Sequence, residues 1–343
     1  MQKVLVTGAA GFIGAALVKA LMDKDYEIVG IDNINSYYAQ TLKYDRLSDA
    51  GIEPVSVRDG GIAQSVKNPL YRFKKMDLSD REAMQSLFAS ERFDVVVNLA
   101  GQAGVRYSIE NPFAYVESNL LGFLNILENC RHYPVKHLVY ASSSSVYGMN
   151  NRIPYIETDK TDMPVSLYAA TKKSDELMAY SYSKLYGIPA TGLRFFTVYG
   201  PWGRPDMAPF IFMKSILEGK PIHVFNHGDM KRDFTYIDDI INGILLLLAH
   251  PSDESVPNRI YNIGHSNPVA LLDFIRTIEE ETERKALIEM EDMQPGDVCC
   301  TYADISHLQH DFGYYPQVSI QQGIHLFYEW YMGYVQKSRE VSL

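Results

Sequence analysis

The chain has 343 residues, of which 46% are hydrophobic, so it is long enough for about two domains with a substantial core. Its formal net charge of -10 excludes a general nucleic-acid or anionic-membrane surface, because such partners bind clustered basic residues. The three cysteines, Cys130, Cys299 and Cys300, form neither a disulfide framework nor a zinc-binding spacing. We therefore expect a cytoplasmic protein without a metal site.

Short apolar runs alternate with amphipathic helical stretches through the first two hundred residues. The predicted strands are "KVLVTG", "EIVGID", "YRFKKMD", "FDVVVNLA", "HLVYASS" and "ATGLRFF". This alternation predicts an α/β fold with a Rossmann-type, doubly wound parallel sheet covered on both faces. Residues 47–70 contain a glycine pair and two prolines, and are predicted to be an irregular surface excursion before the third strand.

After about residue 200 the regular alternation stops, because prolines punctuate shorter elements. We expect a first domain over residues 1–190, with a return of 226–255 to it, and a smaller C-terminal α/β domain over 191–343. The run "IINGILLLLA" at 240–249 is too short to span a bilayer and is predicted to be a buried helix.

A glycine-rich loop lies between the first predicted strand and the first predicted helix. It contains Gly8, Gly11 and Gly14, in the spacing G-x-x-G-x-x-G rather than G-x-G-x-x-G. Glycines here allow a tight turn and let backbone N–H groups approach a pyrophosphate at a helix N-terminus. Asp32 ends the next strand, where a carboxylate accepts both ribose hydroxyls of an adenosine and repels a 2′-phosphate. The sequence therefore predicts NAD binding in preference to NADP.

The stretch "SLYAATKKS" at 166–174 places Tyr168 four residues before Lys172, on one face of a predicted helix. Ionising a phenol, with a pKa near 10, costs about 4 kcal/mol at pH 7. A lysine cation about 4 Å away returns about that much at an effective dielectric near 20. Spacing alone leaves open whether the pair is a catalytic base or ordinary helix surface.

A serine run, Ser142 to Ser145, ends the predicted fifth strand, at the sheet edge where α/β proteins bind ligands. Together with the preceding motifs it resembles the extended short-chain dehydrogenase/reductases, in particular their nucleotide-sugar epimerases. The resemblance covers nearly the whole chain, through "NLAGQAGVRYS", "SSSSVYG", "YAATK", "RFFTVYGPWGRPDM", "HGDMKRDFTYIDD" and "PGDV". "AGVRYS" and "RFFTVYGPWGRPDM" are most similar to UDP-glucuronate 4-epimerases of the capsule-biosynthesis type.

This resemblance implies that Tyr168 takes the proton of the sugar 4-hydroxyl, that Lys172 favours the ionised phenol and holds the nicotinamide ribose, and that Ser143 shares the hydrogen bond. Hydride would pass from C4 to tightly bound NAD and return to the other face of a 4-keto sugar. We therefore expect an NAD-dependent isomerase that converts UDP-glucuronate to UDP-galacturonate for polysaccharide biosynthesis. The first domain would bind NAD, and the second mainly the UDP-sugar.

The resemblance also assigns binding residues. Cofactor contacts are implied for Gly8, Gly11, Phe12, Ile13, Gly14, Asp32, Asn33, Asp77, Leu78, Ala100, Gln102, Asn119, Tyr168 and Lys172. Substrate contacts are implied for Arg106, Ser143, Ser144, Ser145, Thr197, Arg204, Arg232 and Asp297.

Some of these roles are more specific than others. Ser144, Ser145 and Thr197 are candidates to hold the carboxylate. Arg232 resembles the arginine on the UDP diphosphate, and Asp297 the residue that meets the nucleotide's ribose or base. Whether Arg106 or Arg204 faces the uronate or the diphosphate stays open. Gln294 stands where some family members have an arginine, and Asn98 where a histidine is often found.

Three alternatives remain. A neutral UDP-hexose or UDP-N-acetylhexosamine 4-epimerase would use the same machinery. A UDP-glucuronate decarboxylase is less favoured, because related enzymes typically have Asp or Glu in the serine loop. A non-catalytic NAD-binding regulator would be expected to lack Tyr168, Lys172 and Ser143. The helices predicted at about 112–131 and 168–187 are apolar on more than one face, and family members commonly dimerise through the matching helices, so a homodimer is expected.

Overall fold

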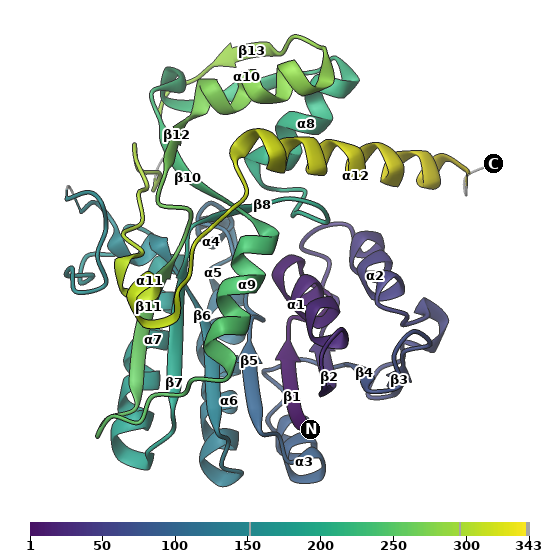
Figure 1. Cartoon of the computed structure of the whole chain (residues 1–343), viewed down its shortest axis with the longest axis vertical. Helices are drawn as coiled ribbons and strands as arrows, with labels where there is room; N and C mark the ends of the chain where they lie inside the picture. Colours follow the sequence, from purple (N-terminus) through teal and green to yellow (C-terminus); the bar gives the residue numbers. More distant parts are fainter. Residues whose placement is uncertain (151, 295, 341–343) are drawn as a thin grey trace. The chain divides into compact units, whose positions relative to one another are not determined.

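The computed structural model describes residues 1–150, 152–294 and 296–340 (Figure 1). Its chain divides into two compact units. The first contains Met1–Asn150, Glu157–Phe195 and Ile241–Asn262. The second contains Phe196–Ile240, the chain from Ile263 onward and a short segment that ends at Ile156. That the first unit binds NAD and the second mainly the UDP-sugar stays a prediction.

An eight-stranded sheet forms the centre of the first unit, in the order β11-β7-β6-β5-β1-β2-β4-β3. The six strands predicted from the sequence correspond to β1, β2, β4, β5, β6 and β7, and each neighbouring pair among them is parallel. The order reverses at β1, so the carboxyl ends of β1 and β5 lie at the switch point where such sheets bind ligands. The Rossmann-type fold class is therefore confirmed. The strands are β1 Gln2–Thr7, β2 Tyr26–Asp32, β3 Ile62–Gln64, β4 Tyr71–Lys75, β5 Val95–Asn98, β6 His137–Ser143, β7 Ala190–Phe195 and β11 Asn258–Ile263.

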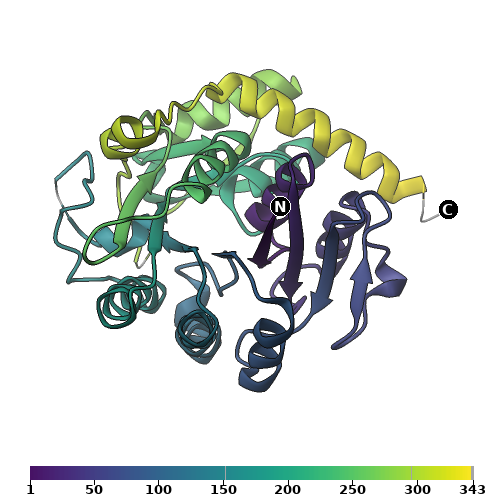
Figure 2. The same ribbon diagram turned by 60° about the horizontal axis from the view of Figure 1, so that its bottom comes forward.

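Helices cover both faces of this sheet, as the strand–helix alternation predicts. Figure 2 shows α3, α6 and α7 side by side below the sheet, with α1 and α9 (Ile237–Leu248) on the opposite face. The helices of this unit are α1 Phe12–Met22, α2 Gln40–Asp49, α3 Arg81–Glu91, α4 Tyr107–Glu110, α5 Pro112–Tyr115, a π-helical segment η2 Val116–Leu121, α6 Gly122–His132 and α7 Leu167–Tyr186, with short 3₁₀ turns η1 Pro54–Ser56 and η3 Ser144–Tyr147.

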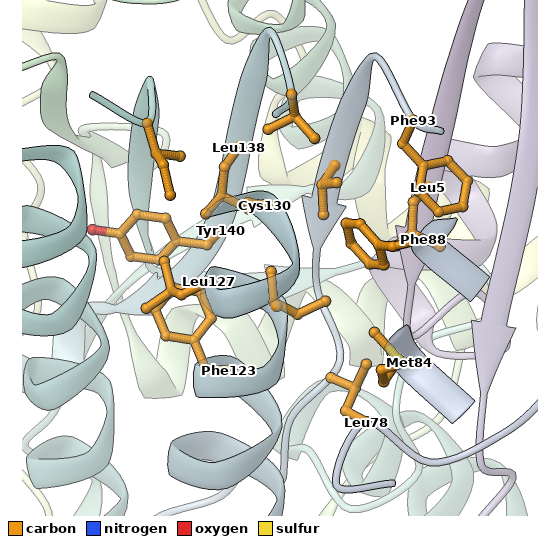
Figure 3. Packing of buried hydrophobic residues seen from close by; sticks show 14 of the residues in the cluster. Leu5, Leu78, Met84, Phe88, Phe93, Phe123, Leu127, Cys130, Leu138 and Tyr140 are labelled. Atoms are coloured by element: carbon orange, nitrogen blue, oxygen red, sulfur yellow. The ribbon is translucent and has the colours of Figure 1, made fainter. Parts of the chain in front are cut away.

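Apolar side chains fill the layer between the sheet and α3 and α6 (Figure 3). Phe88 of α3 packs edge-on against Phe93, and Phe123 of α6 lies 5.1 Å from the Tyr140 ring of β6. Leu5 on β1 and Leu138 on β6 are fully buried in the same cluster. Burying apolar surface stabilises the folded chain by roughly 25 cal/mol per Å². This packing holds the strands of the sheet in place relative to α6.

Residues 47–70 lie mostly outside helices and strands, as predicted, but they also contain short regular elements that the sequence did not indicate. They contain the end of α2, the turn η1 and the strand β3, which pairs antiparallel with β4 at the sheet edge. The Ala63 side chain is 2% exposed, and the Ser65 hydroxyl donates to the Ala50 carbonyl at 2.8 Å. Only three residues form β3, too few for period-two alternation to mark a strand in the sequence.

The second unit contains two smaller sheets. In the three-stranded sheet, β10 pairs parallel with β8 and antiparallel with β12, and the two-stranded sheet pairs β13 parallel with β9. Its elements are β8 Thr197–Tyr199, α8 Ala208–Glu218, β9 Pro221–Val224, η4 Phe225–Gly228, β10 Lys231–Tyr236, β12 Pro268–Ala270, α10 Leu271–Thr282, β13 Leu287–Met290, α11 Ser306–Phe312 and α12 Ile320–Glu340.

The run at 240–249 lies in α9 Ile237–Leu248, where Ile240, Ile244 and Leu247 are fully buried, so the prediction of a buried helix is confirmed. In the described part of the chain, no helix has both the length and the apolar character needed to span a bilayer.

A buried histidine at the start of β6 predicts an acid-sensitive stability. His137 is fully buried, with Nδ1 3.4 Å from the Leu248 carbonyl and Nε2 2.9 Å from the Thr191 hydroxyl. Burial lowers the pKa of His137 to about 4, against an ordinary value of 6.5. Because the unfolded chain takes up this proton first, stability falls as the pH drops below about 6.5, by about 1.4 kcal/mol per unit down to about pH 4.

Urea denaturation of the wild type and of a His137→Gln variant, at pH 7.5 and pH 4.5, measures this contribution. The variant is expected to lose less stability on acidification, by about 2 to 3 kcal/mol. Equal losses in the two proteins would show that His137 does not contribute to the acid sensitivity.

Candidate active site

The glycine loop joins β1 to α1 and is packed against the neighbouring strand end. Gly8 has φ +70°, and a Cβ added there would lie 2.9 Å from the Ala100 backbone nitrogen. A Cβ on Gly14 would lie 2.0 Å from the Gly8 carbonyl oxygen. Helix α1 starts at Phe12, and its N-cap Gly11 provides no side chain to cap the first N–H groups. The loop therefore leaves backbone donors for an anion, which fits the pyrophosphate of a dinucleotide.

Replacing Gly14 by alanine is expected to disrupt this loop. The added methyl group would meet rigid backbone, so we expect a loss of about 1 to 3 kcal/mol in folding stability together with loss of bound NAD. Gly333→Ala in α12 is the matched control, because nothing lies within 4 Å of a Cβ at that position. The control should be neutral or slightly stabilising. NAD content after purification and urea denaturation measure both effects, and a Gly14→Ala protein with full NAD content would contradict the prediction.

Asp32 lies at the carboxyl end of β2 and is 8% exposed. Its Oδ1 accepts a hydrogen bond from the Ile34 backbone N–H at 2.7 Å, and the Nζ of Lys43 lies 3.6 Å from the same oxygen. Lys43 is itself buried and donates to the Asn35 side chain at 2.9 Å. The carboxylate is thus held by the loop after β2 and by α2, at the place that the sequence assigns to the adenosine ribose.

Sequence reasoning missed Lys43 and a second buried cation of α2, Arg46. The Arg46 guanidinium donates to the Ala10 carbonyl in the glycine loop at 3.0 Å and to the Tyr38 hydroxyl at 2.6 Å. Arg46 therefore links α2 and residues 34–39 to the glycine loop. The signal in the sequence was the basic spacing in "LKYDRL", where Lys43 and Arg46 share a face of the helix.

The next predicted cofactor residues follow β4. The Asn33 amide donates to Asp77 Oδ2 at 2.7 Å, and Ser79 donates to Asp77 Oδ1 through both its N–H and its hydroxyl. Burial raises the pKa of the Asp77 carboxyl, but the Asn33 and Ser79 hydrogen bonds outweigh it, and the net pKa is lowered. Leu78 is buried beside them. The structure thus brings Asn33, Asp77 and Leu78 together at the ends of β2 and β4.

At the end of β5 the chain turns back toward α6. Gln102 donates its N–H to Asn119 Oδ1 at 2.8 Å and accepts from Asn119 Nδ2 at 3.0 Å, and Ala100 donates to the Thr7 hydroxyl at 3.0 Å. Asn119 lies in the π-helical segment η2, a distortion frequent at functional sites. Asn119 also donates to the Thr171 hydroxyl of α7 at 2.9 Å. It therefore links the β5 edge to the helix that carries Tyr168.

Tyr168 and Lys172 lie in the first turns of α7. The helix begins because the Ser166 hydroxyl caps the Ala169 N–H at 3.1 Å. The Tyr168 ring is partly exposed and packs edge-on against Tyr115, with ring centroids 6.0 Å apart. Lys172 is 5% exposed, and its Nζ donates to the Ala141 carbonyl at 3.0 Å. The lysine is therefore bound to the end of β6, two residues before Ser143.

The serines continue β6 into the 3₁₀ turn η3. Ser143 is buried and accepts a hydrogen bond from the Ser145 N–H at 3.2 Å, and its hydroxyl donates to the Ser145 hydroxyl at 3.1 Å. Ser142 points the other way and donates to Glu176 at 2.7 Å. The run thus separates into a structural serine, Ser142, and three hydroxyls at the carboxyl edge, Ser143, Ser144 and Ser145.

A buried ion pair supports this edge. Arg194 on β7 donates from Nε and NH2 to the two carboxylate oxygens of Glu176, at 2.8 and 2.9 Å. Its NH1 donates to the Tyr147 hydroxyl at 3.0 Å, and that hydroxyl donates to Asn262 at 2.6 Å. Burial raises the pKa of Glu176, but the hydrogen bonds from Arg194 outweigh it and the net pKa is lowered.

The predicted substrate residues divide between the two units. Arg106 lies in the first unit, exposed at the N-terminus of α4. In the second unit, Thr197 begins β8 and pairs in register with Phe234 of β10. Phe234 is two residues after Arg232 in the same strand. Arg204 follows β8 and donates two hydrogen bonds to the Asp206 carboxylate, one of them from Nε to Oδ1 at 3.0 Å.

Arg232 donates through NH1 to the Lys231 carbonyl at 2.9 Å and to the Cys299 carbonyl at 3.2 Å. Burial lowers the pKa of Arg232, and the nearby Asp297 carboxylate partly opposes that shift. Arg232 and Asp297 therefore lie close enough for their charges to interact. Pro295, which belongs to the same sequence motif, lies outside the described residues.

Comparison with known proteins gives consistent matches over nearly the whole chain. The model of the NAD dependent epimerase/dehydratase family matches residues 4–264. Protein CapI of Staphylococcus aureus is 46% identical over 98% of this chain and 100% of its own. UDP-glucuronate 4-epimerase 4 of Arabidopsis thaliana is 44% identical over 99% of this chain and 77% of its own. The crystal structure of UDP-glucuronic acid 4-epimerase from Bacillus cereus in complex with UDP-glucuronic acid and NAD has a TM-score of 0.86 and 34% identity, covering 97% of this chain and 99% of that one.

Proposed function

As a member of the NAD-dependent epimerase/dehydratase family, this chain is an NAD-dependent nucleotide-sugar 4-epimerase, and we propose that it interconverts UDP-glucuronate and UDP-galacturonate. The observation that carries the proposal is the match over nearly all of the chain to proteins named as UDP-glucuronate 4-epimerases. The all-serine loop after β6 supports it, because that loop holds no carboxylate that could serve as an extra acid or base. The product would supply a precursor for surface polysaccharide.

Tyr168 is proposed to accept the proton of the sugar 4-hydroxyl and later to return it. The Lys172 ammonium, held against the Ala141 carbonyl, provides the positive charge that favours the phenolate. Ser143 donates a hydrogen bond to the same sugar oxygen and keeps it in line with the phenol. Efficient proton transfer needs this kind of fixed geometry, because donor and acceptor must stay within hydrogen-bond distance.

The glycine loop and Asp32 would hold NAD by its pyrophosphate and adenosine ribose, with Asn33, Asp77, Leu78, Ala100, Gln102 and Asn119 around them. NAD, when bound, would accept the hydride of C4 and return it. Because the hydride would leave one face of C4 and return to the other, the sugar undergoes no net oxidation. Lys172 would in addition bind the hydroxyls of the nicotinamide ribose.

An epimerase that acts on a uronate must also prevent decarboxylation, because a 4-keto uronic acid is a β-keto acid. Its carboxylate leaves as CO₂ most easily when the breaking bond aligns with the carbonyl π system. Hydroxyls that hold the carboxylate in another orientation slow this loss. We assign that role to Ser144, Ser145 and Thr197, as the family resemblance implies.

For the UDP part, Arg232 is proposed to bind the diphosphate and Asp297 the ribose or base. The planar guanidinium of arginine matches phosphate oxygens in a two-point contact. Arg106 and Arg204 remain two further candidates for the diphosphate or the carboxylate.

Proton NMR of the purified protein with UDP-glucuronate, UDP-glucose or UDP-N-acetylglucosamine tests the proposal. Without added NAD, UDP-galacturonate is expected to form from UDP-glucuronate, with the H4 coupling of the inverted sugar, and the neutral sugars should stay unchanged. Inversion of a neutral sugar alone would favour the neutral epimerase. UDP-xylose or a UDP-4-keto-pentose as the main product would favour a decarboxylase.

We also propose that the protein forms a homodimer through the helices α6 and α7. Both present large apolar side chains to solvent, among them Leu124 on α6 and Leu177 and Tyr180 on α7, the latter two 60% and 54% exposed. Sedimentation at micromolar concentration is expected to give twice the 38.9 kDa mass of one chain, and Leu177→Glu should shift it to the monomer. Leu287→Glu, at a similarly exposed leucine on β13, is the control that should leave the mass unchanged. A wild type of 38.9 kDa would contradict the dimer.

A further inference from the structure

A buried carboxylate lies against the lysine of the proposed catalytic pair. Asp175 follows Lys172 by one helical turn, and its Oδ2 accepts a hydrogen bond from Lys172 Nζ at 3.1 Å. The two residues are 1% and 5% exposed, respectively. The same Nζ donates to the Ala141 carbonyl at 3.0 Å, so two acceptors fix the ammonium between α7 and β6.

This carboxylate depends on the lysine for its charge. Among the described residues, Asp175 Oδ1 is buried and accepts no hydrogen bond. A buried carboxylate with one unpaired oxygen is costly, and removing its cation would leave an uncompensated charge. Burial raises the pKa of Asp175 to about 6, although Lys172 lowers it.

We propose that Asp175 is a positioning residue for Lys172, one that also offsets part of the ammonium charge acting on Tyr168. This inference rests on the proposed function only in that Tyr168 must act as the base, whichever sugar is bound. Tyr168 and Asp175 are seven residues apart, so they share a face of α7 about 10 Å apart along its axis. At that distance a unit charge shifts an ionisation by about one pH unit at an effective dielectric near 20.

The other charged groups around Asp175 bind one another. Glu176 on the same helix raises the pKa of Asp175, but it is bound by Arg194 of β7 and by Lys173. From β6, Tyr140 faces the pair with a buried phenol whose pKa burial raises well above its usual range, so it stays neutral. From η2, the side chain of Asn119 is uncharged. Lys172 is therefore the group that determines whether Asp175 is ionised.

Two substitutions separate position from charge. Asp175→Asn keeps an acceptor for Lys172 but removes the negative charge, so the Lys172 ammonium should act on Tyr168 without that offset. We expect kcat at its plateau within about threefold of the wild type and an acid limb of the kcat profile moved down by about half to one pH unit. Asp175→Ala also removes the acceptor, and its plateau kcat should fall by about tenfold or more. Glu128→Gln on α6 makes the same charge change elsewhere and should leave the acid limb in place.

A turnover-independent readout keeps the test separate from the substrate. With carbon-13 in the aspartate carboxyls, the Asp175 signal, identified as the one lost in Asp175→Asn, should titrate near pH 6. Lys172→Met should move that titration up by at least about one unit, because the cation that lowers it is gone. The inference would be overturned if the Asp175 signal titrated at the same pH in Lys172→Met as in the wild type. It would also be overturned if the acid limb of the kcat profile stayed in place in Asp175→Asn. If the Asp175 titration shifts in Lys172→Met but the protein does not invert UDP-glucuronate, only the proposed substrate is overturned.

Discussion

Replacing Tyr168 by phenylalanine is expected to reduce kcat by about 100- to 10,000-fold while NAD and UDP-sugar binding are retained. The phenol is the group proposed to move the proton of the 4-hydroxyl, and general acid–base catalysis contributes about that range. Its ring packs against Tyr115, and phenylalanine preserves that contact. The NMR assay gives the rate, and the NAD content of the purified variant shows that the site is still formed.

A matched control lies on the same helix. The Tyr182 hydroxyl donates to Glu128 at 2.7 Å, and Tyr182→Phe removes a phenol without touching the proposed site. Its rate should stay close to that of the wild type. If Tyr168→Phe retained a tenth or more of the wild-type kcat, Tyr168 would not be the catalytic base and another group would have to carry the proton.

Replacing Arg194 by leucine is expected to destabilise the protein by about 3 to 5 kcal/mol. The side chains of Arg194 and Glu176 are 2% and 1% exposed, so the substitution leaves a buried carboxylate without its cation. Glu176 also accepts a hydrogen bond from the Ser142 hydroxyl, and this bond holds the first residue of the serine run in position. We therefore expect a slower enzyme as well as a less stable one.

Two further variants identify the cause of this loss. The double variant Glu176→Leu/Arg194→Leu should recover part of the stability, because no buried charge is left unpaired. Arg276→Leu, which breaks the exposed pair with Asp273, should cost less than about 1 kcal/mol. Urea denaturation at pH 7.5 measures all three. A double variant as unstable as Arg194→Leu would show that lost packing, not unpaired charge, is the cause.

The parts of the fold that were predictable are those specified by neighbouring residues. The strands β1, β2, β5, β6 and β7 contain apolar runs, which is typical of strands buried on both faces, whereas β4 reads YRFKK and alternates buried with partly buried side chains near the sheet edge. The glycine loop and the spacing of Tyr168 and Lys172 are local patterns whose geometry follows from one turn and one helix. The prediction for residues 47–70 missed β3, because β3 is a short edge strand that forms only by pairing with β4.

The contacts that the sequence could not reveal join residues far apart in the chain. Arg46 meets the glycine loop across 36 positions, and Ser142 meets Glu176 across 34. Asn119 reaches Thr171 across 52 positions, through a π-helical segment that has no mark in the residue pattern. Even Asp175, only three residues after Lys172, was not identified from the sequence, because packing against β6 is what buries the pair.

By itself, then, the sequence determined the Rossmann-type sheet, the glycine loop and the tyrosine–lysine pair, because hydrophobic periodicity, glycine spacing and helical repeat act over a few residues. Tertiary structure alone decided which polar groups are buried and which cation each carboxylate faces. Asp32 lies by Lys43, Asp175 by Lys172 and Glu176 by Arg194. The physical reason is that the cost of burying a charge, and the partner that offsets it, depend on solvent exclusion and distance, and both are set when the strands and helices pack.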